Sequence, residues 1–159
     1  MSARMFVSGE IVRLAELLLE IFPAATVHRY QEPEAPASGQ FTVSFKQETR
    51  RNETRSYTAI ERQFEIITYA ETAETAVLWM EAVSRYVMNE RPRAVSGEPV
   101  WNERVESISL NAPIKLESGL RACSAVLTVR SREPIVFEQQ EKMEKVEMRT
   151  TIRLKGGMN

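Results

Sequence analysis

The sequence contains no aspartate, and it has a single histidine, His28, and a single cysteine, Cys123. Without aspartate the chain cannot supply a Ser-His-Asp triad or the loop of an EF-hand. One histidine and one cysteine are too few for a zinc centre that is built from several such ligands. A lone cysteine also excludes an internal disulfide, which fits a chain made in a reducing compartment.

Long apolar runs and phosphate-binding loops are also missing. The segment EIVRLAELLLEIF is interrupted by charged residues, so it predicts neither a membrane span nor the core of a signal peptide. No GxGxxG, GKS or GKT motif is present. The net charge of −1 gives no overall field that would draw the chain onto nucleic acid or an anionic membrane. We therefore expect no cofactor, no metal and no membrane contact, and a cytoplasmic location at first.

The length and composition that remain are typical of one globular domain. The chain has 159 residues, of which 43% are hydrophobic and 27% charged. A chain of this size can bury a core that needs no metal or disulfide. We predict a single domain over 1–159, with a C-terminal tail at 138–159 that is helical around Met143 and Val146 and extended around Thr150 to Leu154.

Two segments have the periodicity of amphipathic helices. In Ser8–Phe22 the apolar residues recur at three- and four-residue steps, with Ser8 as the expected cap and Pro23 as the stop. Its charged residues fall on the opposite face: Glu10, Arg13, Glu16 and Glu20. The second predicted helix is Thr72–Asn89.

The rest of the chain favours strands. Phe41, Val43 and Phe45 alternate with polar residues, and Ile60–Thr68 repeats the pattern, so the two predict a long hairpin. Further strands are expected at Thr26–Gln31, Ile108–Ala112 and Leu120–Val129. This order predicts an α+β fold, with a single antiparallel or mixed β-sheet, two main helices packed on one face and a long projecting hairpin.

The candidate catalytic residues are few. His28 lies in a short strand with Tyr30 two positions on, and no sequence signal places a nucleophile beside it. Cys123 could form a reactive thiolate if Arg121 lowered its pKa, but its small apolar neighbours favour a buried, inert thiol. We expect no catalytic residue and no enzymatic activity.

An arginine-rich segment between the two hairpin strands is the remaining candidate site. Arg50, Arg51 and Arg55 lie near the predicted tip, and Lys46 and Arg62 lie on the arms. Interleaved glutamates cancel much of the positive field that phosphate binding needs. A solvated hairpin end is one interpretation. The other is an arm whose charges pair with a neighbouring subunit, which makes these five residues candidates for a subunit interface.

The order of several short motifs resembles the tail terminator, or tail completion, proteins of tailed bacteriophages and phage-derived particles. These motifs are a helix ending in IFP, then VHRYQEPE, FTVSF, the strand RQFEIITYA running into a helix, SGL before a late strand, and EKMEKVE near the end. The resemblance covers most of the chain and includes no catalytic residue.

The resemblance implies a structural virion protein that forms a hexameric ring on the head-proximal end of the tail tube. Such a ring stops tube polymerisation and presents a surface to neck or connector proteins, and to a sheath where one exists. DNA would pass through its lumen without specific binding.

Two other interpretations stay open from the residues alone. One is a small α+β ligand-binding or enzymatic domain that uses His28, Tyr30 or Cys123. The other is a nucleic-acid-binding module built on the arginine hairpin.

Overall fold

The computed structural model describes residues 6–89 and 104–135, which form an α+β fold with one mixed sheet and two helices. The strand order is β1-β2-β3-β6-β4, and β5 pairs with one end of β6. The predicted tail at 138–159 lies outside the described residues. The elements in chain order are α1 (Val7–Ile21), β1 (Thr26–Arg29), β2 (Gln40–Asn52), β3 (Tyr57–Ala70), α2 (Ala73–Asn89), β4 (Arg104–Leu110), β5 (Ile114–Lys115) and β6 (Arg121–Pro134).

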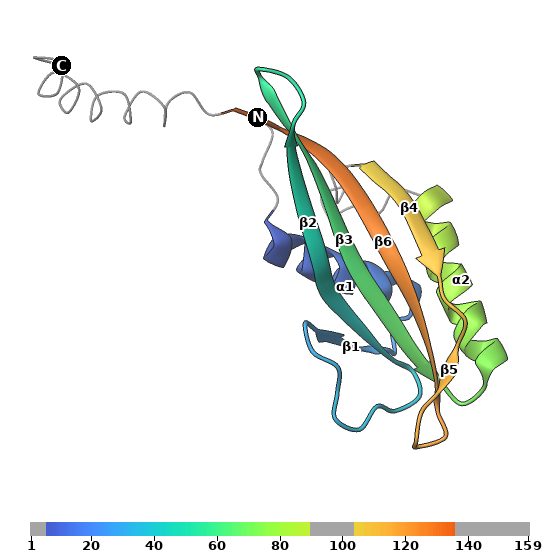
Figure 1. The fold of residues 1–159 in the computed structure, drawn as a ribbon. Helices are drawn as coiled ribbons and strands as arrows, with labels where there is room; N and C mark the ends of the chain where they lie inside the picture. Colours follow the sequence, from blue (N-terminus) through green and yellow to red (C-terminus); the bar gives the residue numbers. More distant parts are fainter. Residues whose placement is uncertain (1–5, 90–103, 136–159) are drawn as a thin grey trace, which may run out of the picture.

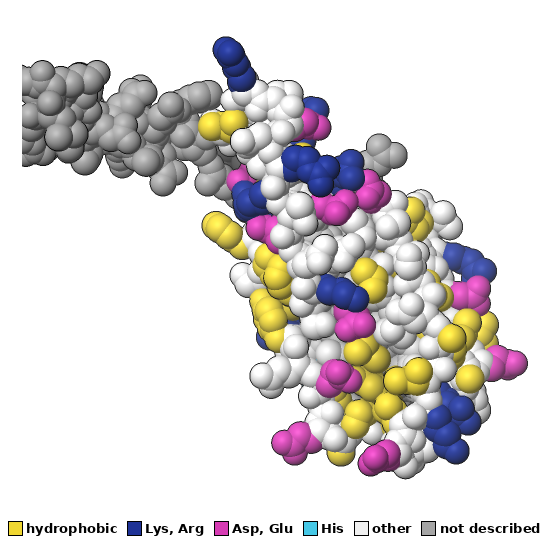
Figure 2. All heavy atoms as spheres, viewed as in Figure 1, with side chains coloured by type: hydrophobic (Ala, Val, Ile, Leu, Met, Phe, Trp, Pro, Cys, Tyr) yellow, Lys and Arg dark blue, Asp and Glu magenta, His cyan; other side chains and the backbone are white. Residues whose placement is uncertain are grey.

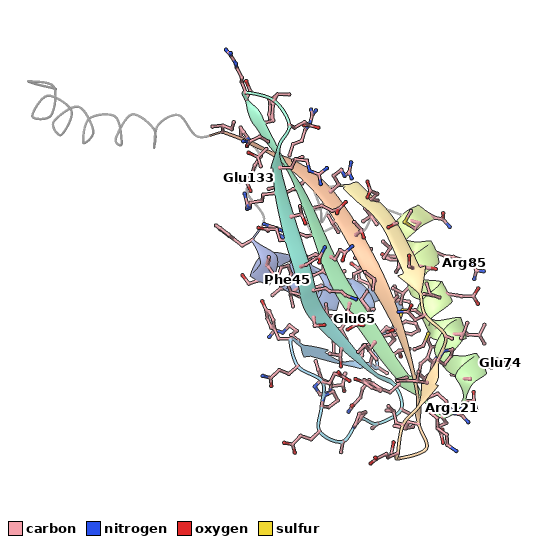
Figure 3. All side chains as sticks on the ribbon, viewed as in Figure 1. Phe45, Glu65, Glu74, Arg85, Arg121 and Glu133 are labelled. Atoms are coloured by element: carbon pink, nitrogen blue, oxygen red, sulfur yellow. The ribbon has the colours of Figure 1, made fainter. Side chains whose placement is uncertain are left out.

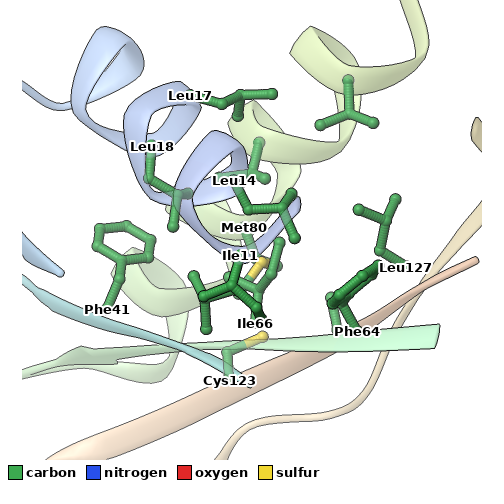
Figure 4. Close-up of a cluster of buried hydrophobic side chains, with 14 of the residues drawn as sticks. Ile11, Leu14, Leu17, Leu18, Phe41, Phe64, Ile66, Met80, Cys123 and Leu127 are labelled. Carbon is green, nitrogen blue, oxygen red and sulfur yellow. The ribbon is translucent and has the colours of Figure 1, made fainter. Parts of the chain in front are cut away.

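Both helices cover the same face of the sheet, as the sequence predicts. Figure 1 views the sheet from the opposite face, with α1 and α2 behind the strands. The apolar stripes of the helices meet alternate residues of β2, β3 and β6 in one continuous core, part of which Figure 4 shows. The largest fully buried side chains of this core include Leu14, Phe41, Phe64, Ile66, Met80 and Leu127.

The other face of the sheet is mostly polar and carries a small apolar cluster at one end. There Ile67, Tyr69 and Ala122 are buried, with Leu116 and Leu120 packed against them. These residues lie where β3 ends and β6 begins, which we call the proximal end of the sheet. The proximal end is therefore packed on both faces.

The predicted hairpin is long, and the structure adds a third strand to it. We call the part of the sheet between Arg62 and the hairpin turn the distal end. There β6 continues beside β3 until Pro134 lies opposite Tyr57. The hairpin strands also extend further than the apolar alternation predicts, with β2 reaching Asn52. At Lys46 an irregularity between Phe45 and Gln47 shifts the register by one residue. This bulge and the charged residues beyond it hide the strand pattern in the sequence.

The helix boundaries confirm one predicted helix start and correct one predicted cap. The Thr75 N–H donates to the Thr72 hydroxyl at 3.1 Å, which caps α2 where its helix was predicted to start. In contrast, Phe6 is the N-cap of α1 and makes no side-chain cap. The predicted Ser8 cap is wrong because the helix begins one residue before Ser8.

Candidate subunit-interface site

The arginine-rich segment forms the distal end of the sheet and its turn. The turn closes because the Thr54 hydroxyl accepts hydrogen bonds from the backbone N–H groups of Ser56 and Tyr57, at 3.1 and 3.0 Å. Figure 2 shows Lys and Arg side chains mixed with glutamates at this end of the molecule. The five predicted residues separate here into two groups that differ in their partners.

Arg62 belongs to a buried group that joins α1 to the hairpin. Its side chain is 5% exposed and donates to Glu10 at 2.8 Å and to Glu48 at 2.6 Å. Glu10 is itself buried, although the helix periodicity places it on the solvent face. That prediction is wrong because the guanidinium of Arg62, on the helix-covered face of β3, lies against the first turn of α1 and neutralises the carboxylate.

Arg50 extends this group toward β6. It donates to Glu48 at 2.9 Å and to Glu133 at 3.3 Å. The charges therefore alternate in sign along a chain of contacts from α1 through β3 and β2 to β6. We call this chain the ion-pair network: Glu10, Arg62, Glu48, Arg50 and Glu133.

The pKa shifts in the ion-pair network follow from these contacts. Burial tends to raise the pKa of Glu48, but hydrogen bonds from Arg50 and Arg62 outweigh it and the pKa is lowered. Burial opposes the charged form of Arg62, yet Glu48 and Glu10 outweigh it and the pKa of Arg62 is raised. These contacts favour the charged forms of Glu48 and Arg62 and join β2 to β3.

Lys46, Arg51 and Arg55 form the second group. Each is exposed, and none has an ion-pair partner within the part of the chain that the structure describes. Lys46 lies at the bulge on the outer side of β2, Arg51 near the end of the same strand and Arg55 in the turn. Arg50 and Arg62 are engaged within the subunit, so these three cations are the candidates that remain available to another molecule.

Strand β6 contributes charges to the distal end that the sequence does not assign to it. Arg130 contacts Glu61 at 3.2 Å and Glu106 at 3.1 Å, and Arg132 pairs with Glu53. Each of these two arginines thus has at least one glutamate partner. This pairing leaves few free cations to meet a phosphate backbone, which weighs against the nucleic-acid interpretation.

The candidate catalytic residues are not brought together. The register places His28 beside Thr42 on the uncovered face of the sheet, whereas Cys123 belongs to the core under the helices. Burial raises the pKa of the Cys123 thiol, and the thiol donates to the carbonyl of Asn111 at 3.4 Å. The thiol is therefore buried as predicted.

A polar group lies beside His28 at the proximal end. The Tyr69 hydroxyl donates to Glu32 and shares a hydrogen bond with Thr42, each at 3.2 Å. Burial, with a smaller effect of the Glu32 charge, raises the pKa of Tyr69 to about 12. The imidazole Nε2 of His28 is buried and has no hydrogen-bond partner among the described residues. This arrangement ties the loop after β1 to the sheet.

The described surface is hollowed at both ends of the sheet. One hollow, of about 330 Å³, is mostly apolar and lies beside Phe22, Phe41 and Trp79. The other, of about 130 Å³, lies at the distal end beside Arg51, Glu61 and Arg130. Within residues 6–89 and 104–135, no three His, Cys or Glu side chains are grouped so that they could hold a metal ion. No helix in this part of the chain is both long and apolar enough to cross a membrane.

Comparisons with known proteins give the following result. No protein family matches the chain, and neither does any curated protein. Among solved structures, the chain is similar to a chain from the virion of the native gene transfer agent particle. That match has 15% sequence identity and a TM-score of 0.45, and it covers 82% of this chain and 99% of the other.

Proposed function

We propose that this chain is a structural virion protein that forms a hexameric ring on the head-proximal end of a tail tube. There it stops tube polymerisation and provides the surface on which neck or connector proteins, and a sheath where one exists, assemble. The ring would be built in the host cytoplasm and end in the virion. The number six and the position on the tail come from the sequence resemblance described above.

The observation that carries this proposal is the open sheet. β4 borders one side of the sheet, and β1 covers only Gln40–Val43 of β2 on the other. Within the described residues, both borders have backbone groups without a neighbouring strand. Borders of this kind promote association with other chains. Two different borders that meet between identical copies make a heterologous contact, which closes into a ring when the rotation permits.

The uncovered face of the sheet supports the same proposal. Its central row consists of uncharged polar residues from four neighbouring strands, and the charges beyond that row are largely paired. A surface of this kind neither attracts nor strongly repels a nucleic acid, which suits the wall of a channel that DNA traverses. The central row is Gln47, Gln63, Thr128 and Ser107.

The cations that have no ion-pair partner among the described residues lie at the free border of β2 and in the turn, where they would face protein. Lys46, Arg51 and Arg55 are placed on the outer side and turn of the hairpin, as an arm toward a neighbouring subunit requires. Such charges contribute orientation and partner choice more than affinity.

The test is to purify tails from particles that carry or lack this chain. We expect the chain to be present at six copies per tail, in a ring at the head-proximal end that electron microscopy resolves. Tails that lack the chain should contain tubes of uncontrolled length. Tubes of normal length, or complete tails without the polypeptide, would overturn the proposal.

A further inference from the structure

We propose that the outer side of β2 receives β4 of a second copy as an antiparallel strand, with Glu106 of that copy against Lys46 or Arg51. This inference rests on the proposed ring and names the surfaces that would close it. The β2 border is Ser44–Asn52, and the β4 border is Arg104–Leu110. Both borders lack a neighbouring strand within the described residues.

The directions of the strands fit this pairing. Along the order β2-β3-β6-β4 each strand is antiparallel to the next. β2 and β4 therefore run in opposite directions at the two sides of the sheet. A second copy that is placed side by side, without inversion, brings its β4 antiparallel to β2 and continues the sheet. Figure 1 shows these two strands on opposite sides of the sheet.

The backbone groups on both borders point outward at matching residues. The Tyr30 N–H donates to the Val43 carbonyl at 2.7 Å, so the backbone N–H and C=O groups of Val43 point away from β3. Because these directions alternate along a strand, those of Phe45 point away from β3 as well. The Asn111 N–H donates to the Ser124 carbonyl at 2.9 Å, so Asn111 points toward β6. Leu110, one residue earlier, therefore points away from it.

The side chains of these outward residues are compatible. Phe45 is opposite Phe64 and Leu110 is opposite Ala125, so both side chains lie on the helix-covered face. Phe45 is 38% exposed and Leu110 is 37% exposed, which is unusual for large apolar residues on that face. Figure 3 shows Phe45 on β2 beside α1. Pairing in the register that sets Phe45 opposite Leu110, which brings Glu106 toward Arg51, would join these apolar side chains and remove them from water.

The bulges on the two borders carry charges of opposite sign. β2 has a bulge between Phe45 and Gln47 that contains Lys46, and β4 has one between Val105 and Ser107 that contains Glu106. Bulges and charges protect sheet borders from indiscriminate pairing. When the charges are complementary, the same features admit a matching border and reject others.

Glu106 is placed to reach a cation across the border. It contacts Arg130, whose position opposite Glu61 lies on the uncovered face of the sheet. Arg51 lies opposite Ala59, in register with this same face, and is exposed without an ion-pair partner among the described residues. Because Arg130 also contacts Glu61 at 3.2 Å, Glu106 can turn toward a second copy without leaving Arg130 unpaired.

The experiment reverses these charges in the full-length chain. The single variants are Glu106→Lys, Lys46→Glu and Arg51→Glu, and the double variants combine Glu106→Lys with each of the other two. The matched control is Glu117→Lys, a reversal at an exposed glutamate in the turn before β6 at the proximal end. Self-association is measured by sedimentation over a range of concentrations, and thermal melting verifies that every variant is folded.

We expect Glu106→Lys to weaken self-association by about tenfold or more, which corresponds to about 1.4 kcal/mol or more. One double variant should restore the association to within about threefold of the wild-type chain. Restoration by Lys46→Glu or by Arg51→Glu identifies the cation that Glu106 meets, and with it the register. The control should associate like the wild-type chain.

The proposal is overturned if Glu106→Lys associates normally, if neither double variant is restored, or if the wild-type chain does not self-associate. Its failure differs from a failure of the proposed function. A ring that still caps purified tails while the charge reversals have no effect would show that other surfaces close it. Restored pairing in a chain that is absent from tails would refute the tail position alone.

Discussion

The two ends of the sheet are built from the same three strands and are held together by different interactions. At the proximal end, β2, β3 and β6 lie between the helical core on one face and the cluster around Tyr69 on the other. At the distal end, beyond Arg62, ion pairs between glutamates and arginines join the three strands and the turn. Arg62 lies at the boundary and belongs to both regions.

This difference indicates where the stability of the fold resides. Apolar burial contributes about 25 cal/mol for each Å² removed from water, so the proximal end supplies most of the free energy of folding. Exposed ion pairs contribute about 0–1 kcal/mol each, so the distal end is only weakly stabilised by its charges. Its side chains can therefore be changed with little effect on the fold, which is a property expected of a binding surface.

The largest effect is expected in the proximal core. Phe64 is fully buried and packs edge-on against Phe45, with ring centroids 6.0 Å apart. Phe64→Ala should lower the free energy of unfolding by about 3–5 kcal/mol, because it removes a buried ring and leaves a cavity. Urea unfolding measures the change. Phe45→Ala is the matched control, and since Phe45 is partly exposed its loss should cost clearly less. Equal losses would show that the depth of burial does not set the cost of removing a ring at the proximal end.

The next effect is expected at the boundary. Arg62→Met removes the cation from the buried Glu10 carboxylate and should cost about 2–3 kcal/mol, because that carboxylate loses a charged partner. Adding Glu10→Leu should recover most of the loss, since an apolar pair can replace a buried ion pair of similar volume. A double-mutant cycle in urea measures the coupling. Losses that simply add would show that the two residues do not act as a pair.

Much of the fold follows from apolar periodicity, and most of the site does not. The helices, the hairpin and the single covered face could be predicted because buried apolar residues recur at helical or strand spacing. The partner of Arg62 could not be predicted, since Glu10 lies far away in sequence and has the spacing of a solvent-facing residue. Arg62 itself gave a signal, because it occupies an apolar register position on β3 between Ile60 and Phe64.

The strand bulges were equally hidden. A bulge shifts the side-chain alternation by one residue, so Lys46 breaks the pattern on which strand prediction depends. The part of β6 that pairs with the hairpin tip also has no apolar period, because its residues at the distal end are mainly charged. Its charges were therefore not assigned to the site. Long-range pairing of charged strands is set by the tertiary fold and leaves little trace in local sequence.

A smaller effect is expected from acid, and it should concentrate at the distal end. The pKa of Glu48 is lower in the folded chain than its ordinary value. The Glu48 charge therefore stabilises the fold at pH values above its ordinary pKa, and this stabilisation is lost as the pH falls through the folded pKa. Below about pH 4 we expect a loss on the order of 1 kcal/mol. Urea unfolding at pH 6 and pH 3 measures it.

The matched variant for the acid experiment is Glu48→Gln. It should be less stable than the wild-type chain at pH 6, and the difference should shrink toward pH 3 as the pH falls through the folded pKa of Glu48 and the wild-type carboxyl loses its charge. Glu117→Gln, at an exposed turn position, is the control and should show no such convergence. A difference that is constant between the two pH values would mean that the Glu48 charge is not what joins β2 to Arg62.

The smallest effect on stability is expected at the turn. Arg55 is exposed and has no ion-pair partner among the described residues, so Arg55→Ala should change the free energy of unfolding by no more than about 0.5 kcal/mol. Arg50→Ala, near the end of β2, should lower the free energy of unfolding by more, because it breaks contacts with Glu48 and Glu133. Thermal melting of the two variants side by side measures the contrast. If Arg55 proves as costly to remove as Arg50, the turn contributes to folding, and the separation of a folded proximal end from a recognition surface at the distal end does not hold.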